Sequence, residues 1–436
     1  MRRAIMVCAT KQHTGKTSVS MALLDRLSKH FGQRGGRVGY MKPVGQQWVE
    51  VSEPCGRRRR VDKDAALAYQ YFGLTDPIGC VSPVVIGRGD TKAFLDERLD
   101  DLSETMMAER LTHAYETVAA ANDFVIVEGT GHCGVGAVLG WNNARVAATL
   151  GVEVVLVANG GIGSTFDDLA LNVTACHAEG ARIAGIIVNK CAPSKIDEVS
   201  SYLQRASDRF GWGVPVLACV PFGDDLDKPS VHDLVHLFEG GFSREEQRGH
   251  RYDPSRSSSA TAARSSTIRS GSYPDKQQRP VLLAGGEHLS RRFSHYELVT
   301  TSLERFMGRL LDLEKNSGWQ QAPVCFVTHS SRSDVISGLL GHRAIVESIE
   351  HYPSFGGGLI IAGSADHRLG SFVEEYIRMA KFPILRSNLR MTQTLAAIKD
   401  FTPKMQAEDD QRVRSVIALY GPHLEDAVIR IVGCDD

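Results

Sequence analysis

The residues with the clearest chemical potential lie near the start of the chain, where Gly15, Lys16 and Thr17 follow one another. A phosphate site needs inward-turned backbone N–H groups, a helix N-terminus, a lysine for the outer phosphates and a hydroxyl for Mg²⁺. Thr10 replaces the first glycine of the usual pattern, but the tripeptide lies between the apolar run 4–9 and a helical pattern that begins at Lys16. This context predicts a strand, a phosphate-binding loop and a helix, with a chance Gly-Lys-Thr at a helix start as the alternative. The residues expected to bind the nucleotide are His13, Thr14, Gly15, Lys16, Thr17 and Ser18.

Two further charged residues come at the ends of apolar runs. Lys42 follows the run 38–41, and Glu128 follows the run 124–127. In a parallel sheet the carboxyl ends of the strands meet at one edge, where ligands bind. A lysine there could hold an anionic substrate or a transferring phosphoryl group, and a carboxylate there could hold Mg²⁺ or its water ligands. Taken alone, Lys42 has the alternative of a lysine that extends from the sheet into solvent.

Polar residues elsewhere in the first half are candidates for metal and base contacts. Asp62 and Asp64 precede a helical pattern, so one of them is expected to cap that helix. Asp64 is also a candidate metal ligand, and a helix cap without a metal is the equal alternative. Asn189 ends the apolar run 183–188 and carries an amide that can pair with a nucleotide base, although a strand-terminal turn needs no ligand. His132 is a candidate for a polar contact to substrate.

The elements that must position these residues alternate between β-rich runs and helical patterns. Nearly continuous apolar strands separated by helices indicate a parallel sheet covered on both faces. We therefore predict an α/β fold with a doubly wound parallel sheet and its ligand site at the carboxyl ends of the strands. The strands are expected at 4–9, 38–41, 124–127, 152–157, 183–188 and 216–220, and the helices at 16–31, 106–122, 142–150, 166–179 and 196–210.

The composition of the chain changes after residue 237, which predicts three parts. Residues 1–237 form the expected nucleotide-binding domain. Residues 238–279 are rich in Ser, Arg and Gly and offer little to bury, so they are expected to be a disordered linker. Residues 280–436 predict a second, smaller α/β domain. Its strands are expected at 324–328 and 358–362, and its helices at 296–313, 333–340, 372–380 and 392–401.

Composition argues against several classes of function. The 436-residue chain has a formal net charge of −1, which gives no overall attraction to nucleic acids or anionic membranes. Its nine cysteines lack a paired metal-binding spacing, and we find no apolar run of membrane-spanning length. The arginine run 57–60 is interpreted as a solvated loop. Because the first strand begins by Ala4, we expect no signal peptide and a cytoplasmic protein.

Together these residues resemble the dethiobiotin synthetase-like branch of phosphate-loop ATPases over about residues 3–225. The resemblance rests on Gly15-Lys16-Thr17, the segment 39–44, the Asp64-Ala65 pair, and the segments 127–129 and 185–189. It implies that Lys16 and Thr17 bind ATP and Mg²⁺, and that Asp64 and Glu128 assist the metal. It also implies that Lys42 contacts an acid substrate and that Asn189 reads the base.

A fused form of that domain is a closer resemblance. The segments 128–132 and 160–164, followed by a small α/β module, are similar to the non-catalytic N-terminal half of long phosphotransacetylases and to cobyrinic acid a,c-diamide synthase-like proteins. In the fused proteins the second module is a DRTGG domain, and residues 280–420 fit that place through the segments 328–336 and 356–363. The pentapeptide that names the domain does not occur in the chain, and we do not carry acetyl transfer over to it.

Two functions follow from these observations, and the sequence leaves the choice open. In the first, ATP and Mg²⁺ activate a small carboxylate or carbamate by phosphorylation, with Lys16, Lys42 and Glu128 as the catalytic residues. In the second, a regulatory or scaffold protein binds ATP without turnover and acts through its C-terminal domain. Nucleotide is the expected partner in both cases. The sequence does not decide between a monomer, a homodimer and a larger assembly.

Overall fold

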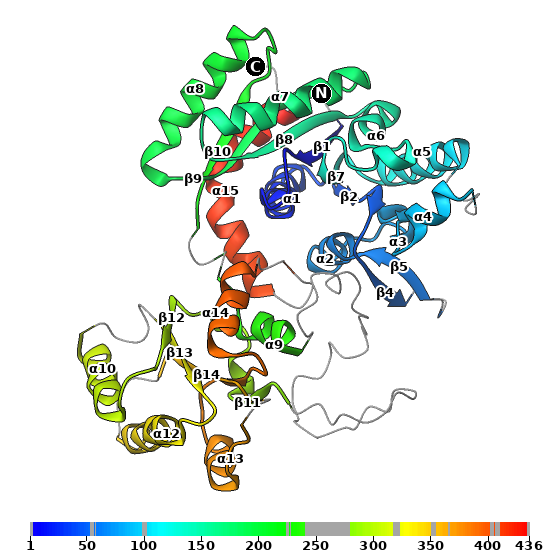
Figure 1. The fold of residues 1–436 in the computed structure, drawn as a ribbon. Helices are drawn as coiled ribbons and strands as arrows, with labels where there is room; N and C mark the ends of the chain where they lie inside the picture. The colour runs from blue at the N-terminus through cyan, green and yellow to red at the C-terminus, as the bar shows by residue number, and fades with distance from the viewer. Residues whose placement is uncertain are drawn as a thin grey trace. The chain divides into compact units, whose positions relative to one another are not determined.

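A six-stranded sheet forms the centre of the first half of the chain, and all of its strands are parallel. The computed structural model describes residues 3–52, 56, 58–97, 103–223, 226, 228–239, 280–316, 323–349, 355–364, 367–401, 405 and 410–433. In spatial order the strands are β10 (Val216–Pro221), β9 (Ile183–Cys191), β8 (Glu153–Asn159), β1 (Ala4–Ala9), β7 (Phe124–His132) and β2 (Val38–Met41) (Figure 1).

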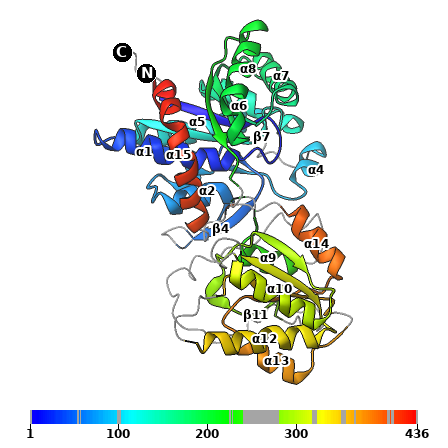
Figure 2. The same cartoon turned by 90° about the vertical axis from the view of Figure 1, so that its left-hand side faces the viewer.

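Helices cover both faces of this sheet, which confirms the doubly wound α/β fold (Figure 2). One hydrophobic core joins the strands to α5 (Glu104–Ala121), α6 (Asn143–Leu150), α7 (Gly163–Ala178) and α8 (Ile196–Arg209). On the other face, α1 (Lys16–Gly32) packs against α15 (Asp410–Val432), and α15 also contacts β10. Along the chain, smaller elements come between β2 and α5: β3 (Val44–Gly45), β4 (Trp48–Ser52), β5 (Arg58–Asp62), α2 (Lys63–Tyr71), α3 (Ile78–Val81), β6 (Val84–Val85) and α4 (Asp90–Leu95).

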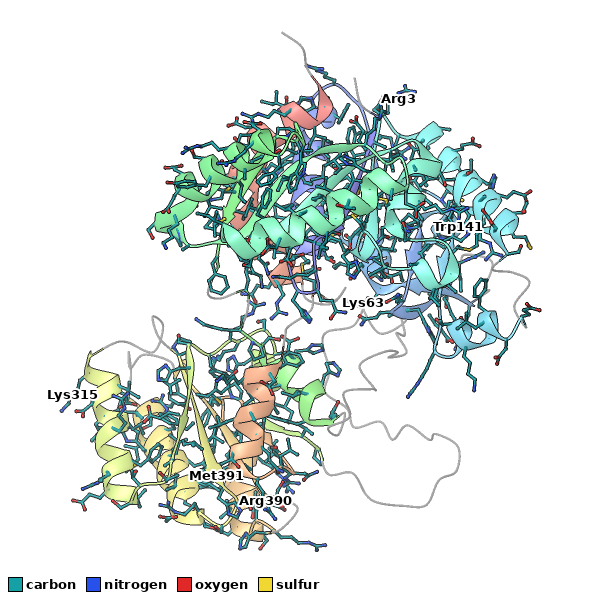
Figure 3. The ribbon with its side chains drawn as sticks, turned by 45° about the horizontal axis from the view of Figure 1, so that its top comes forward. Arg3, Lys63, Trp141, Lys315, Arg390 and Met391 are labelled. Carbon is teal, nitrogen blue, oxygen red and sulfur yellow. The ribbon has the colours of Figure 1, made fainter. Side chains whose placement is uncertain are left out.

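A second sheet has five strands in the order β11-β15-β14-β13-β12. Its strands are β11 (Leu282–Ala284), β12 (His295–Leu298), β13 (Val324–His329), β14 (Gly358–Ala362) and β15 (Ile384–Arg386), and β11 alone runs antiparallel to its neighbour. One core contains α10 (Leu303–Asn316), α12 (Ser333–Glu347) and α13 (Ser371–Arg378), and another contains α9 (Val231–Glu239) and α14 (Met391–Asp400). In each sheet, apolar side chains fill the space between strands and helices (Figure 3).

The chain divides into two compact units whose boundaries differ from the expected ones. Among the described residues, the first unit combines 3–223 with 405 and 410–433, and the second combines 226–239 with 280–401. The expected domain 1–237 is therefore too long, because α9 buries Val231 and Leu234 in a core of the second unit. The expected domain 280–436 is also too long, because α15 packs on α1. Residues 240–279, most of the predicted linker 238–279, lie outside the described residues.

Two local expectations are wrong for identifiable reasons. The predicted helix 296–313 is a strand, β12, followed by α10, because the polar stretch 300–302 interrupts the helical pattern. The arginine run is not a loop, because Arg58, Arg59 and Arg60 form β5, which pairs antiparallel with β4; Arg57 lies outside the described residues. Arg58 and Arg60 are exposed to solvent, as expected, and the Arg60 guanidinium lies 4.4 Å from the ring centroid of Trp48. No helix among the described residues combines the length and apolar composition needed to cross a bilayer.

Candidate functional site

The loop that joins β1 to α1 has the expected strand–loop–helix geometry. β1 is buried along its whole length, and α1 begins at Lys16, directly after Gly15. Gly15 has φ of +82°, a conformation that residues with a side chain rarely adopt, and a Cβ there would collide with the Asn189 amide. Glycine is therefore required at this position. His13 also has positive φ, +63°, so the loop turns sharply twice before the helix.

Inside the loop, two buried hydroxyls are left without a partner. The Oγ1 atoms of Thr10 and Thr14 have no hydrogen-bond partner among the described residues, and both residues are at most 5% exposed. A buried hydroxyl without a partner costs free energy, so such groups in native proteins need an explanation. Beside a phosphate loop, hydroxyls of this kind are candidate donors to a bound anion. Ser18, the third residue of α1, is half-buried.

Asn189 supports the phosphate loop from β9, which is separated from β1 by β8. Its side chain is fully buried, its Nδ2 donates to the Thr14 carbonyl over 2.7 Å, and its Oδ1 accepts from the Lys190 N–H over 2.8 Å. An amide has two N–H donors and two acceptor lone pairs, so the hydrogen bonds to described residues use one donor and one lone pair. The structure thus places Asn189 beside the loop, and its reading of a base stays a prediction.

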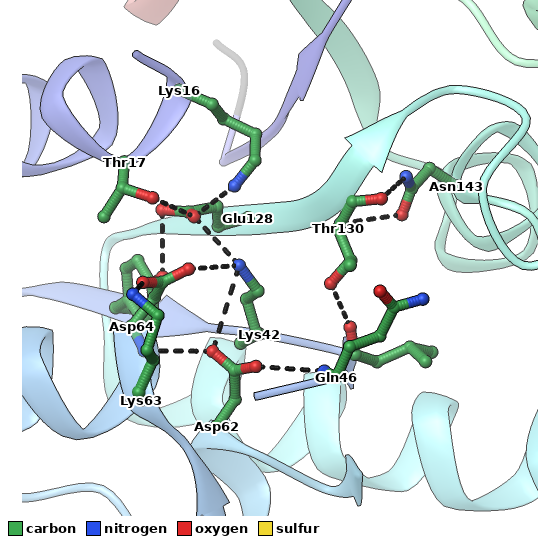
Figure 4. Close-up of polar contacts among 12 residues, drawn as sticks. Lys16, Thr17, Lys42, Gln46, Asp62, Lys63, Asp64, Glu128, Thr130 and Asn143 are labelled. Carbon is green, nitrogen blue, oxygen red and sulfur yellow. Dashed lines mark hydrogen bonds and ion pairs between the residues drawn. The ribbon is translucent and has the colours of Figure 1, made fainter. Parts of the chain in front are cut away.

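Glu128 is the centre of the polar cluster beside the loop (Figure 4). Its Oε1 accepts from the Lys16 ammonium, from Thr17 Oγ1 over 3.0 Å and from Lys42 Nζ over 3.0 Å. Its other oxygen, Oε2, accepts from the Tyr40 hydroxyl over 3.0 Å. Glu128 lies within β7 and not at its end, because the strand continues to His132. The cluster joins the start of α1, which follows β1 through the loop, to Glu128 in β7 and to Tyr40 and Lys42 in and directly after β2. The strands β1, β7 and β2 are adjacent in the sheet, so the cluster lies at the expected edge.

The two aspartates near α2 have different roles. Asp62 caps the helix, because its Oδ1 accepts from the Asp64 N–H over 2.9 Å. Asp64, in the first turn, instead accepts from Lys42 over 2.9 Å and from Lys63 over 3.0 Å. The prediction that one of the pair caps the helix is confirmed. Because Lys42 also contacts Glu128, a single ammonium bridges the two carboxylates that were expected to assist a metal.

The charges in this cluster are held fixed by one another. Burial opposes the charge of Glu128, but Lys16 and Lys42 lower the pKa of its carboxyl to about 2. Burial also opposes the charge of Lys42, yet Asp64 and Glu128 raise the pKa of its ammonium well above the usual value. The pKa of Lys16 is lowered, because burial outweighs the attraction of Glu128. Strongly perturbed groups of this kind gather at functional sites more often than elsewhere.

Sequence reasoning missed two residues that complete the site. Tyr40 looks like a core residue of an apolar strand, and its contact with Glu128 is visible only once β2 and β7 are paired. Asn143 fixes the end of β7, because its Oδ1 accepts from the Thr130 N–H and its Nδ2 donates to the Thr130 carbonyl (Figure 4). Its Nδ2 also donates to the His132 carbonyl. A signal for Tyr40 existed in the sequence: it lies two residues before Lys42, and side chains at that spacing on a strand share a face. His132 itself is exposed, and its Nδ1 accepts from the Gly134 N–H.

Comparison with known families finds a match over most of the first unit. A family model described as an AAA domain, AAA_26, matches residues 3–230. The ATP-dependent dethiobiotin synthetase BioD of Anaeromyxobacter dehalogenans (strain 2CP-1) is 29% identical over 225 residues, which cover 51% of this chain and 92% of that protein.

Two further proteins illustrate the range of similarity. A phosphate acetyltransferase of Nitratidesulfovibrio vulgaris is 20% identical over 440 residues, which cover 98% of this chain and 51% of that protein. The chain thus spans about half the length of that relative. A solved structure of cobyrinic acid a,c-diamide synthase from Mycobacterium smegmatis with bound ADP and magnesium matches with a TM-score of 0.29 and 18% identity, over 51% of this chain and 88% of that one.

Proposed function

The chain belongs to the AAA_26 family, and from that premise we propose that its first unit binds ATP with Mg²⁺ and phosphorylates a small carboxylate or carbamate. The observation that carries the proposal is the convergence of Lys16, Thr17 and Lys42 on one oxygen of Glu128. This arrangement puts a phosphate-loop lysine and hydroxyl within reach of a carboxylate and a second cation. Phosphoryl transfer needs such positioning and charge stabilisation more than it needs covalent chemistry.

The residues present fit a magnesium ion. Asp64 and Glu128 already share one cation, since both accept from the Lys42 ammonium over 2.9 and 3.0 Å. Thr17 adds a hydroxyl that lies 3.0 Å from the same Glu128 oxygen. Two carboxylates and a hydroxyl are the hard oxygen ligands that Mg²⁺ accepts when it also binds phosphates and water. We therefore propose Thr17, Asp64 and Glu128 as the residues that hold it.

Each charged residue has a defined part in the proposed transfer. Mg²⁺, when bound, would neutralise charge on the outer phosphates. Lys16 would hold the transferring phosphoryl group from the loop side. Lys42, whose pKa is raised by Asp64 and Glu128 so that its ammonium stays charged, would hold the carboxylate of the acceptor. The name of the dethiobiotin synthetase relative supports an ATP-dependent reaction. The experiment described next identifies the acceptor of this chain.

The test is ADP release by the full chain with a panel of small carboxylic acids and amines. The enzyme proposal predicts that at least one acid stimulates ADP release about tenfold or more, and that hydroxylamine then traps an activated acyl group. Lys42→Met is expected to raise the KM for that acid with little change in ATP affinity. Lys16→Met should abolish turnover, whereas Lys29→Met, at an exposed position of the same helix, should not. Equal ADP release with every acid would refute the transfer reaction.

One observation favours a second candidate, an ATP-sensing protein without turnover. The chain leaves the first unit after β10, builds the second unit, and returns to the first unit as α15. We propose for this case that nucleotide binding beside α1 alters α15 and, through the chain, the second unit. Hydrogen exchange in residues 280–401 should then change when ATP is added to the wild type and not to Lys16→Met. Identical exchange with and without ATP would contradict sensing.

A further inference from the structure

Tyr40 is a fully buried tyrosine on β2 that contacts the centre of the candidate site. Its hydroxyl donates to Glu128 Oε2 over 3.0 Å, while Glu128 Oε1 takes all the contacts from Lys16, Thr17 and Lys42. We infer that Tyr40 is a positioning residue that fixes the orientation of the Glu128 carboxylate for Mg²⁺. This inference rests on the proposed function, because it assigns a role within the same nucleotide site.

The pairing of two strands places the phenol beside the carboxylate. β2 and β7 are parallel neighbours in which Tyr40 is in register with Ile126, two residues before Glu128. Lys42 lies two residues after Tyr40, directly after the end of β2, and both side chains contact Glu128. The backbone therefore brings a neutral donor and a cation to the two oxygens of one side chain.

The division of contacts between the two oxygens explains what the phenol adds. A carboxylate held at one oxygen can rotate about its terminal torsion, which has a broad energy profile. Binding Oε2 to Tyr40 removes that freedom and leaves Oε1 facing Lys16, Thr17 and Lys42. Partners that orient a metal ligand in this way are worth about tenfold to a hundredfold in metal affinity.

Packing alone does not account for a tyrosine at this position. Phenylalanine would fill the same space, and a buried hydroxyl carries a desolvation penalty unless it is hydrogen-bonded. The Glu128 carboxylate offsets that penalty here. Tyr40→Phe therefore separates the two roles, since it keeps the ring and removes only the donor.

The experiment measures nucleotide binding by the full chain as a function of Mg²⁺ concentration, with a fluorescent ATP analogue as the probe. Tyr40→Phe is expected to raise the Mg²⁺ concentration for half-saturation about tenfold or more, and to change binding without Mg²⁺ less than about twofold. Tyr296→Phe is the matched control, because that hydroxyl is buried in the second unit without a hydrogen-bond partner among the described residues. It is expected to leave the Mg²⁺ dependence unchanged. Thermal unfolding of each variant checks that it is folded.

A second background tests whether Tyr40 acts through Glu128. In Glu128→Gln there is no carboxylate to orient, so adding Tyr40→Phe should shift the Mg²⁺ dependence by less than about twofold. An equal shift in both backgrounds would overturn the inference, as would a wild-type Mg²⁺ dependence in Tyr40→Phe. If the wild type itself binds no nucleotide, the proposed function fails and the role of Tyr40 fails with it. If nucleotide binding by the wild type depends on Mg²⁺ and Tyr40→Phe shows the same dependence, the inference is refuted while the proposed function stands.

Discussion

Replacing Glu128 with glutamine is expected to destabilise the first unit strongly, because it removes the carboxylate on which two buried ammonium groups depend. Glu128 is fully buried, and its Oε1 accepts from both Lys16 and Lys42. Lys42 keeps a second partner in Asp64, 2.9 Å away, but Lys16 loses its ion pair. Glutamine has the same size, so the change is one of charge. Breaking a buried ion pair from one side costs about 3–5 kcal/mol.

The lowered pKa of Glu128 gives a second route to the magnitude. The pKa of the Glu128 carboxyl falls from an ordinary value of 4.5 to about 2 in the folded protein. That difference corresponds to about 3 kcal/mol of preference for the charged form, at about 1.4 kcal/mol for each pKa unit. Both routes therefore predict a loss of about 3 kcal/mol at neutral pH.

The assay is urea unfolding followed by tryptophan fluorescence. Glu104→Gln is the control, since Glu104 is 72% exposed, pairs with Arg145 at the surface and should cost less than about 1 kcal/mol. Adding Lys16→Met to Glu128→Gln should restore about half of the loss, because it removes one uncompensated ammonium. A Glu128→Gln variant as stable as Glu104→Gln would refute the reasoning. A Trp319→Phe background leaves the tryptophans of the first unit as reporters, namely Trp48, Trp141 and Trp212.

Three further predictions concern acidity, the loop and the last helix. Because the pKa of Glu128 is lower in the folded protein than in the unfolded one, the contribution of this group to stability is complete above about pH 4.5 and is lost as the pH falls toward 2. The unfolding free energy should therefore drop by about 2 kcal/mol between pH 6 and pH 3 because of this group, as measured by urea unfolding at each pH. Gly15→Ala should weaken ATP binding about tenfold or more in calorimetry, because its Cβ collides with Asn189 at positive φ. Leu424→Ala should lower the stability of the first unit by about 2–4 kcal/mol in thermal unfolding, because Leu424 is fully buried on α15, the helix that packs on α1.

Each of these predictions has a matched control or a contradicting result. Gly35→Ala has a similar φ of +72° but no neighbour within 4 Å of the added Cβ, so it should leave ATP affinity unchanged. Equal ATP affinities for Gly15→Ala and Gly35→Ala would contradict the proposed collision. A stability that does not change between pH 6 and pH 3 would contradict the acid prediction. A Leu424→Ala variant with wild-type melting behaviour would contradict the packing of α15 on α1.

The sequence predicts the nucleotide site better than the arrangement of the chain around it. The bounds of β1 and β2 agree with the predicted ones, because short apolar runs between polar segments have few other ways to be buried. Lys42 and Glu128 come together as expected, since the carboxyl ends of parallel strands share one edge. The spacing of Tyr40 and Lys42 predicts a shared face, but the contact of Tyr40 with Glu128 also requires β2 to pair with β7, which that spacing does not specify.

The largest differences concern helices whose apolar stripes fit more than one core. The helix α15 follows the second unit in the sequence, and position along the chain favoured the wrong unit for it. Its contacts with the first unit are specific, because Arg26 pairs with Glu425 over 3.0 Å and Arg430 donates to the Val216 carbonyl over 3.3 Å. The apolar stripe of a helix indicates which side of the helix is buried, but it does not indicate which unit the helix packs on.

Calorimetric titration of ATP into the full chain, with and without Mg²⁺, tests the central claim most directly. The phosphate loop and the Glu128 cluster predict saturable binding that strengthens with Mg²⁺ and disappears in Lys16→Met while that variant remains folded. A flat titration of the folded wild type, or binding that is the same in Lys16→Met, would contradict the account.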